Sequence, residues 1–168
     1  MMNTDLHATR TLLIVDDQAP VRDTLRFILT RAGFHVVTAE SGATALVAAE
    51  TQSIDAALID VNMPAMDGFE TSCRLHTLAE ETGRPLRMWL MTGAANALMD
   101  QKAAECGTFG LLRKPFDLPG LIETLDNGFS EPLRRPEQHA EVVAAAVSAI
   151  ESGHYPSWNS LHQMDPGR

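Results

Sequence analysis

The chain has 168 residues, of which 45% are hydrophobic and 21% charged, a composition typical of a globular protein. Its formal net charge of −9 argues against a protein that coats nucleic acid, because neutralising phosphates requires clustered Lys and Arg; we expect no direct DNA binding. No apolar run approaches the ~20 residues of a membrane span, and the N-terminus lacks the apolar core of a signal peptide. The sequence therefore predicts a cytoplasmic protein without membrane contact.

Short apolar runs alternate with segments of helical periodicity along most of the chain. In chain order, strands are predicted at 12–15, 36–38, 56–59, 88–91 and 109–112, and the helices between and after them at about 21–29, 45–49, 68–81, 96–106 and 118–127. Gly33, Gly83 and Gly107 follow the first, third and fourth helices, where glycine is a frequent stop signal. Five strands alternating with five helices predict an α/β fold with a parallel sheet covered on both faces.

The two cysteines, Cys73 and Cys106, stand far apart in the sequence and form no CxxC pattern. Unpaired cysteines behave as small, buried hydrophobic residues. We therefore expect two reduced thiols packed in or near the core.

Polar residues stand at the ends of four of the five predicted strands: Asp16 and Asp17 after the first, Asp60 after the third, Thr92 after the fourth and Lys114 after the fifth. An aspartate after a strand is often only a helix cap or a turn residue. Because the carboxyl ends of parallel strands meet at one edge of a sheet, we expect these five side chains to converge there.

Three converging carboxylates repel one another unless positive charge intervenes. Lys114 can supply one charge, and a divalent cation can supply two. Mg²⁺ suits this set because it prefers oxygen ligands, uses few carboxylates and often bridges to a phosphoryl group. Since no His or Cys stands among these strand ends, the sequence does not favour zinc.

Four segments, "VDDQAPVR", "LIDVNMPAMDGFE", "MTGAAN" and "LLRKPF", resemble the receiver domain of bacterial two-component response regulators in order and separation. The likeness covers residues 11–129 and is closest to stand-alone receivers of the chemotaxis-regulator type. It implies a flavodoxin-like, doubly wound five-stranded sheet with strand order 2-1-3-4-5.

The resemblance also implies the role of each site residue. Asp60 would accept a phosphoryl group from a phosphohistidine of a sensor kinase or a histidine phosphotransfer protein. Asp17 would bind Mg²⁺ directly, Asp16 through water, and the backbone carbonyl of Asn62 would complete the protein's share.

The switch residues follow from the same resemblance. Thr92 would hydrogen-bond the transferred phosphoryl oxygens and Lys114 would pair with them, with the Lys114–Pro115 bond in the cis form that is usual in this family. Many receivers carry Tyr or Phe three residues before the lysine, as part of the switch, whereas this chain has Leu111. By strand alternation we expect Phe109 on the same face, in partial compensation or as plain core.

The chain after Phe129 is shorter than 40 residues, too short for a typical second folded domain. We expect a flexible N-terminus at 1–10, the receiver at 11–129, and an extension at 130–168 with one amphipathic helix at about 136–152 and a flexible tail. That helix would pack on its own receiver or dock against a second subunit or target.

The sequence thus predicts a single-domain response regulator that signals through protein contacts. We expect a phosphoacceptor that assists its own phosphorylation and dephosphorylation, and not an enzyme. A homodimer through the fourth helix and fifth strand, or through the C-terminal helix, is a further expectation. The alternatives are a phosphorelay intermediate, a receiver-fold adaptor that is never phosphorylated, and a small α/β enzyme, for which no further nucleophile or cofactor fingerprint is present.

Overall fold

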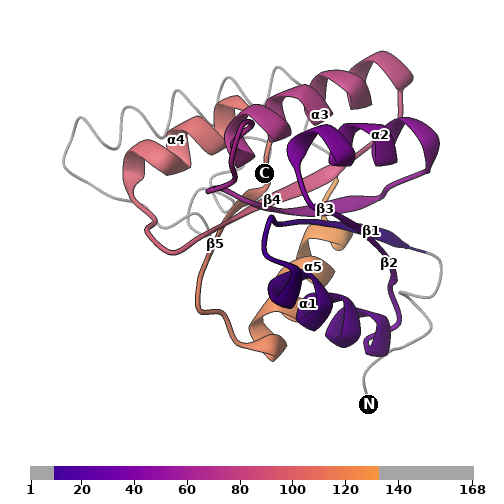
Figure 1. Cartoon of the computed structure of the whole chain (residues 1–168), viewed down its shortest axis with the longest axis vertical. Helices are drawn as coiled ribbons and strands as arrows, with labels where there is room; N and C mark the ends of the chain where they lie inside the picture. The colour runs from indigo at the N-terminus through magenta and orange to yellow at the C-terminus, as the bar shows by residue number, and fades with distance from the viewer. Residues whose placement is uncertain (1–9, 133–168) are drawn as a thin grey trace, which may run out of the picture.

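A computed structural model describes residues 10–132, in which five β-strands alternate with five α-helices (Figure 1). The elements are β1 (Thr11–Val15), α1 (Ala19–Arg31), β2 (His35–Ala39), α2 (Gly42–Thr51), β3 (Ala56–Asp60), α3 (Gly68–Thr82), β4 (Arg87–Thr92), α4 (Ala97–Glu105), β5 (Gly110–Arg113) and α5 (Leu118–Ser130). All strand pairs are parallel and the strand order is β2-β1-β3-β4-β5. The predicted fold class and strand order are confirmed; the predicted helix at 136–152 lies outside the described residues.

The sheet is the middle of three layers, with α2, α3 and α4 on one face and α1 and α5 on the other (Figure 1). Alternate residues of the strands enter the two faces, so Leu90 packs towards α2, α3 and α4 while Trp89 and Met91 pack towards α1 and α5. Because both faces are covered, β3 is buried throughout, which explains the apolar run at 56–59 that precedes Asp60.

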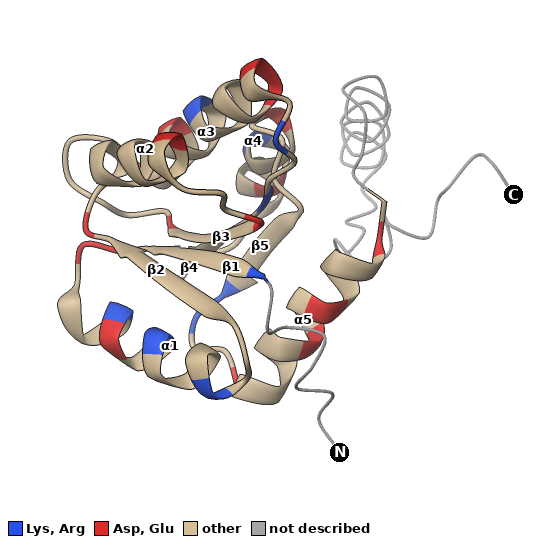
Figure 2. Cartoon of the chain, turned by 90° about the vertical axis from the view of Figure 1, so that its right-hand side faces the viewer, with Lys and Arg blue, Asp and Glu red and all other residues tan. Residues whose placement is uncertain are grey.

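Charged residues are confined to helix surfaces, loops and strand ends, and the body of the sheet is uncharged (Figure 2). Among residues 10–132, no helix has the length and apolar character that crossing a membrane would require. The charges that approach the sheet do so at the ends of its strands, where the predicted site lies.

Helix boundaries follow local hydrogen bonding. Asp67 and Asn96 are the N-caps of α3 and α4, and their side chains accept hydrogen bonds from the amides of Glu70 and Met99 at 2.8 and 3.0 Å. Gly83, with φ of 64°, is the C-cap of α3, so the predicted stop signal is confirmed there.

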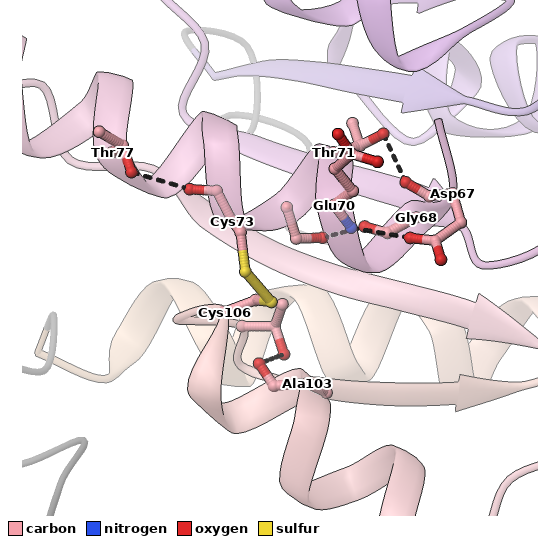
Figure 3. The surroundings of a disulfide bond; sticks show 10 residues. Asp67, Gly68, Glu70, Thr71, Cys73, Thr77, Ala103 and Cys106 are labelled. Atoms are coloured by element: carbon pink, nitrogen blue, oxygen red, sulfur yellow. Dashed lines mark hydrogen bonds between the residues drawn. A yellow bond between two sulfur atoms is a disulfide. The ribbon is translucent and has the colours of Figure 1, made fainter. Parts of the chain in front are cut away.

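The cysteine prediction is wrong: Cys73 and Cys106 form a disulfide that joins the middle of α3 to the C-cap of α4 (Figure 3). Only Cys106 is buried, whereas Cys73 is exposed. The two residues are 33 positions apart in sequence, but α3 and α4 are neighbours on one face of the sheet, and the Cα atoms are 4.3 Å apart. Gly107 permits this close approach, because a Cβ atom there would collide with the His76 ring.

Candidate functional site

The carboxylates of Asp16, Asp17 and Asp60 come together at the carboxyl ends of β1 and β3. One ligand oxygen from each lies within 4.8 Å of those of the other two, and the group contains no His or Cys. Gly68, the first residue of α3, packs against the backbone of Asp60 and Val61, leaving no room for a Cβ atom, and so holds α3 close to this edge. The predicted convergence of the three aspartates is present in the structure.

Lys114 reaches this cluster from the end of β5. Its Nζ donates hydrogen bonds to Asp60 Oδ1 at 2.7 Å and to Asp16 Oδ2 at 3.2 Å. Burial opposes its charge, but the hydrogen bond and charge of Asp60, together with Asp16, outweigh this effect and raise the pKa of Lys114 above its ordinary value. Lys114 therefore remains an ammonium group at neutral pH and offsets part of the repulsion among the aspartates.

Asp60 is only 5% exposed. Burial raises the pKa of its carboxyl group, and the neighbouring charges of Asp16 and Asp17 act in the same direction, whereas Lys114 opposes the shift without cancelling it. A carboxylate in this setting gains from any additional positive charge placed beside it.

Asp16 and Asp17 have different surroundings. Asp16 is fully buried; besides Lys114, its carboxylate accepts a hydrogen bond from the Gln18 amide at 2.9 Å, and its carbonyl accepts one from Arg22. The Asp17 side chain is exposed, and within residues 10–132 no hydrogen bond to its carboxylate is present. Asp17 is therefore the carboxylate most available to a cation, and its role as a direct ligand stays a prediction.

The three carboxylates form an oxygen-only ligand set that suits a hard divalent cation such as Mg²⁺. Asn62, whose carbonyl is the predicted fourth ligand, follows Asp60 by two residues and is exposed. The assignment of its carbonyl stays a prediction.

Thr92 ends β4 and is 1% exposed. Its Oγ1 accepts a hydrogen bond from the Ala94 amide at 3.1 Å, and its carbonyl accepts one from the Lys114 amide at 2.7 Å. The Lys114–Pro115 bond is cis, as the resemblance implied. Thr92 and Lys114 thus stand together, and the Thr92 hydroxyl, which is the acceptor in this turn, keeps its own O–H as a hydrogen-bond donor.

Leu111 and Phe109 lie on opposite faces of the sheet, so the expectation of a shared face is wrong. Leu111 is half-buried against the cluster under α2, α3 and α4, whereas Phe109 packs on Trp89 in the cluster under α1 and α5, with ring centroids 5.4 Å apart. The alternation fails because β5 begins at Gly110, leaving Phe109 outside the strand. Phe109 is plain core, and the role of Leu111 in switching stays a prediction.

One residue near the site has no counterpart in the sequence prediction. Arg113 donates a hydrogen bond to the Ala95 carbonyl at 3.1 Å, and so ties the end of β5 to the loop between β4 and α4. An exposed arginine beside a lysine gives no sequence signal that distinguishes such a contact from a solvated charge.

A protein-family model described as the response regulator receiver domain matches residues 12–126. The chain belongs to this family. The chain is 30% identical over 141 residues to the transcriptional regulatory protein FixJ of Bradyrhizobium diazoefficiens, covering 83% of this chain and 67% of FixJ. It is 32% identical over 107 residues to sporulation initiation phosphotransferase F of Bacillus subtilis, covering 64% of this chain and 83% of that protein.

Among solved structures, the receiver is similar to the chemotaxis protein CheY4 of Vibrio cholerae, with a TM-score of 0.65 and 32% identity over 71% of this chain and 98% of that one. Some curated relatives are much longer: the chain spans only 26% and 27% of two transcriptional regulators that it matches.

Proposed function

We propose that Asp60 accepts a phosphoryl group from a phosphohistidine, on a sensor histidine kinase or a histidine phosphotransfer protein, with Mg²⁺ as cofactor. The observation that carries this proposal is the contact of Lys114 Nζ with Asp60 Oδ1 at 2.7 Å, inside the cluster of three aspartates. A buried carboxylate that is paired with an ammonium group and faces two further carboxylates is placed to act as a nucleophile once its charge is screened.

In the proposed reaction, a carboxylate oxygen of Asp60 attacks phosphorus, the bond from phosphorus to the donor's histidine nitrogen breaks, and an acyl phosphate forms. Asp17, Asp60 and the Asn62 carbonyl would hold Mg²⁺ directly and Asp16 through water, and the ion would supply charge stabilisation for the transferred group. Lys114 stabilises the phosphoryl charge from the β5 side, and the Thr92 hydroxyl donates to a phosphoryl oxygen.

This chemistry makes the protein a phosphoacceptor that assists its own phosphorylation and dephosphorylation, without turnover of a free substrate. Neither Asn62 nor Ala94, the residues two beyond Asp60 and Thr92, has a side chain that can act as a general base on a hydrolytic water. Hydrolysis of the acyl phosphate therefore depends on water access.

We further propose that the protein acts in the cytoplasm and signals through protein contacts; the net charge of −9 supports the second point, because it disfavours direct contact with DNA. The alternative role, as a phosphorelay intermediate, is favoured by the alignment with 83% of sporulation phosphotransferase F, a protein named as a phosphotransferase.

The test is incubation of the full-length protein with phosphoramidate and Mg²⁺, followed by intact mass measurement. We expect the mass gain of one phosphoryl group, its loss when EDTA is present, and no gain in Asp60→Asn. Asp23→Asn, which changes an exposed aspartate of α1, is the matched control and should be phosphorylated normally. No Asp60-dependent gain would favour an adaptor that uses the receiver fold only for binding.

A further inference from the structure

The disulfide between α3 and α4 takes no part in the proposed phosphoryl transfer. We propose that the Cys73–Cys106 bond is a redox site: a dithiol reductant cleaves it in the folded protein, and cleavage releases α4 from α3 (Figure 3). In the reducing cytoplasm predicted from the sequence, disulfides are usually transient and often redox-sensing. The effect on phosphorylation derived below rests on the proposed function, whereas the redox reaction does not.

The two cysteines differ in exposure, and this difference sets the direction of attack. Cys73 is exposed on α3, while Cys106 is 4% exposed. Thiol–disulfide exchange requires the attacking thiolate to reach one sulfur atom, so the accessible target is Cys73 Sγ.

The exchange proceeds in two steps. The reductant's thiolate bonds to Cys73 Sγ, the Sγ–Sγ bond breaks, and Cys106 leaves as a thiolate that takes a proton from water. The reductant's second thiol, as its thiolate, then attacks the mixed disulfide and releases Cys73, while the reductant closes to its own disulfide. Two electrons pass from the reductant to the cysteine pair.

The expected release of α4 rests on how few noncovalent contacts hold this helix: Met99 packs partly buried against the core, and Lys102 Nζ lies 4.4 Å from the centre of the Phe69 ring of α3. α4 has nine residues, too few for an isolated helix to be stable, and its buried members are the small residues Ala103 and Ala104. Small side chains bury little apolar area, and Leu98 at the other end of the helix is 74% exposed. The covalent bond at the C-cap is therefore a principal attachment of α4 to α3.

The bond also closes a covalent loop around the switch region. Residues 73–106 include the end of α3, β4 with Thr92, the following loop and all of α4. Thr92 Oγ1 accepts a hydrogen bond from the amide of Ala94, in the loop that leads into α4, so a movement of Thr92 towards a phosphoryl group would either carry this loop with it or break that bond. With its far end bonded to α3, α4 resists movement of this loop, so reduction should strengthen binding of a phosphoryl group.

The experiment treats the full-length folded protein with dithiothreitol, without denaturant, and then with iodoacetamide. We expect both cysteines to become alkylated, and a brief glutathione pulse to leave its adduct on Cys73. Amide hydrogen exchange in α4 should accelerate about ten-fold on reduction, while α1 stays unchanged. The proposal would be overturned by any of three results. These are alkylation that occurs only in urea, a first glutathione adduct on Cys106, and equal amide hydrogen exchange of α4 in the oxidised and reduced protein.

Two variants test the amide hydrogen exchange of α4 without a reductant. Cys73→Ser changes an exposed position and removes the disulfide. Without dithiothreitol, its α4 amides should exchange as fast as those of the reduced wild type. Thr77→Ala, one turn further along α3, keeps the disulfide and should behave as the oxidised wild type, because Thr77 Oγ1 donates within residues 10–132 to the Cys73 carbonyl alone, at 3.1 Å. Slow α4 exchange in Cys73→Ser would contradict the attachment role.

Coupling to the site is measured with beryllofluoride and Mg²⁺, an analogue of the phosphoryl group, by calorimetry. We expect the reduced protein to bind it about five-fold more tightly, at the lower end of typical couplings between sites. Equal affinities in both redox states would refute the coupling. If neither redox state binds the analogue and Asp60 accepts no phosphoryl group, the proposed function fails. The redox proposal is then still tested by the alkylation and hydrogen-exchange experiments.

Discussion

Lys114 Nζ lies 2.7 Å from Asp60 Oδ1 and 3.2 Å from Asp16 Oδ2, so one ammonium group holds two of the three clustered carboxylates. Its side chain is 28% exposed, and the two carboxylates are almost completely buried. The pairing offsets part of the repulsion among the three carboxylates, and so it links the stability of the fold to the chemistry of the site.

Replacing Lys114 by Met should therefore lower the free energy of unfolding in EDTA by about 1 to 3 kcal/mol, because two buried carboxylates lose their partner. Mg²⁺ should restore part of this loss, since the ion binds the folded state. Urea unfolding with and without Mg²⁺ measures both effects. The control is Lys102→Met, which removes an exposed lysine of α4 and should respond little to Mg²⁺; an equal Mg²⁺ response in the two variants would contradict the pairing.

The raised pKa of Asp60 predicts a pH dependence of stability in the absence of Mg²⁺. Between the unfolded pKa near 3.8 and the higher folded pKa, the folded state binds more protons, so the free energy of unfolding falls as pH rises. Asp60→Asn should remove this contribution and be more stable than wild type at neutral pH, by about 1.4 kcal/mol for each unit by which the pKa is raised. Unfolding curves from pH 3 to 8 that keep the same slope in Asp60→Asn and wild type would show that the shift is absent.

The different surroundings of Asp16 and Asp17 predict different consequences of their loss. Asp17→Asn should weaken Mg²⁺ binding at least about ten-fold more than Asp16→Asn, since direct ligation by an unpaired carboxylate is lost. Asp16→Asn should cost more stability, because the Asp16 carboxylate accepts hydrogen bonds from Lys114 and Gln18. Calorimetric titration with Mg²⁺ ranks the two variants by affinity, and urea unfolding ranks them by stability. If Asp16→Asn weakened Mg²⁺ binding more than Asp17→Asn, direct ligation would be assigned to Asp16.

Loss of the disulfide should also destabilise the fold. The bond joins residues 33 positions apart. In the chain-entropy model, closing a loop of this length restricts the unfolded chain and adds about 3 to 4 kcal/mol to the free energy of unfolding. This is the upper value for the loss expected in Cys106→Ser or on reduction. Denaturant unfolding of the oxidised and reduced protein measures it, and equal midpoints would mean that the bond does not constrain the unfolded chain.

Leu111→Ala addresses the switch. Because Leu111 is half-buried, the truncation should cost about 1 to 2 kcal/mol of stability. We expect it also to weaken phosphorylation-dependent binding or oligomerisation, compared by solution mass before and after phosphoramidate treatment. A variant that loses stability but keeps the response would place Leu111 outside the relay.

Much of the fold follows from local sequence patterns. The apolar runs around Ile14, Leu58 and Leu90 predict strands buried on both faces, and the glycine after α3 predicts its end. Each strand boundary lies within one residue of the prediction, and β3 and β4 end one residue later because the hydrogen-bonded ladder extends over their polar ends, Asp60 and Thr92.

The site was predictable because parallel strands deliver their final residues to one edge, so the order of elements alone places Asp17 near Asp60. The face of Phe109 was not predictable, since alternation holds only inside a strand and β5 begins one residue later. The disulfide depends on the packing of α3 against α4, which sequence spacing does not encode.

The most direct test of the central claim is to identify the phosphorylated residue. The full-length protein is treated with phosphoramidate and Mg²⁺, the acyl phosphate is cleaved with sodium borohydride, which converts the modified aspartate to homoserine, and the peptides are mapped by mass spectrometry. We predict homoserine at position 60 alone. Homoserine at Asp16 or Asp17, or at none of the three aspartates, would contradict the assignment of Asp60 as the phosphoryl acceptor.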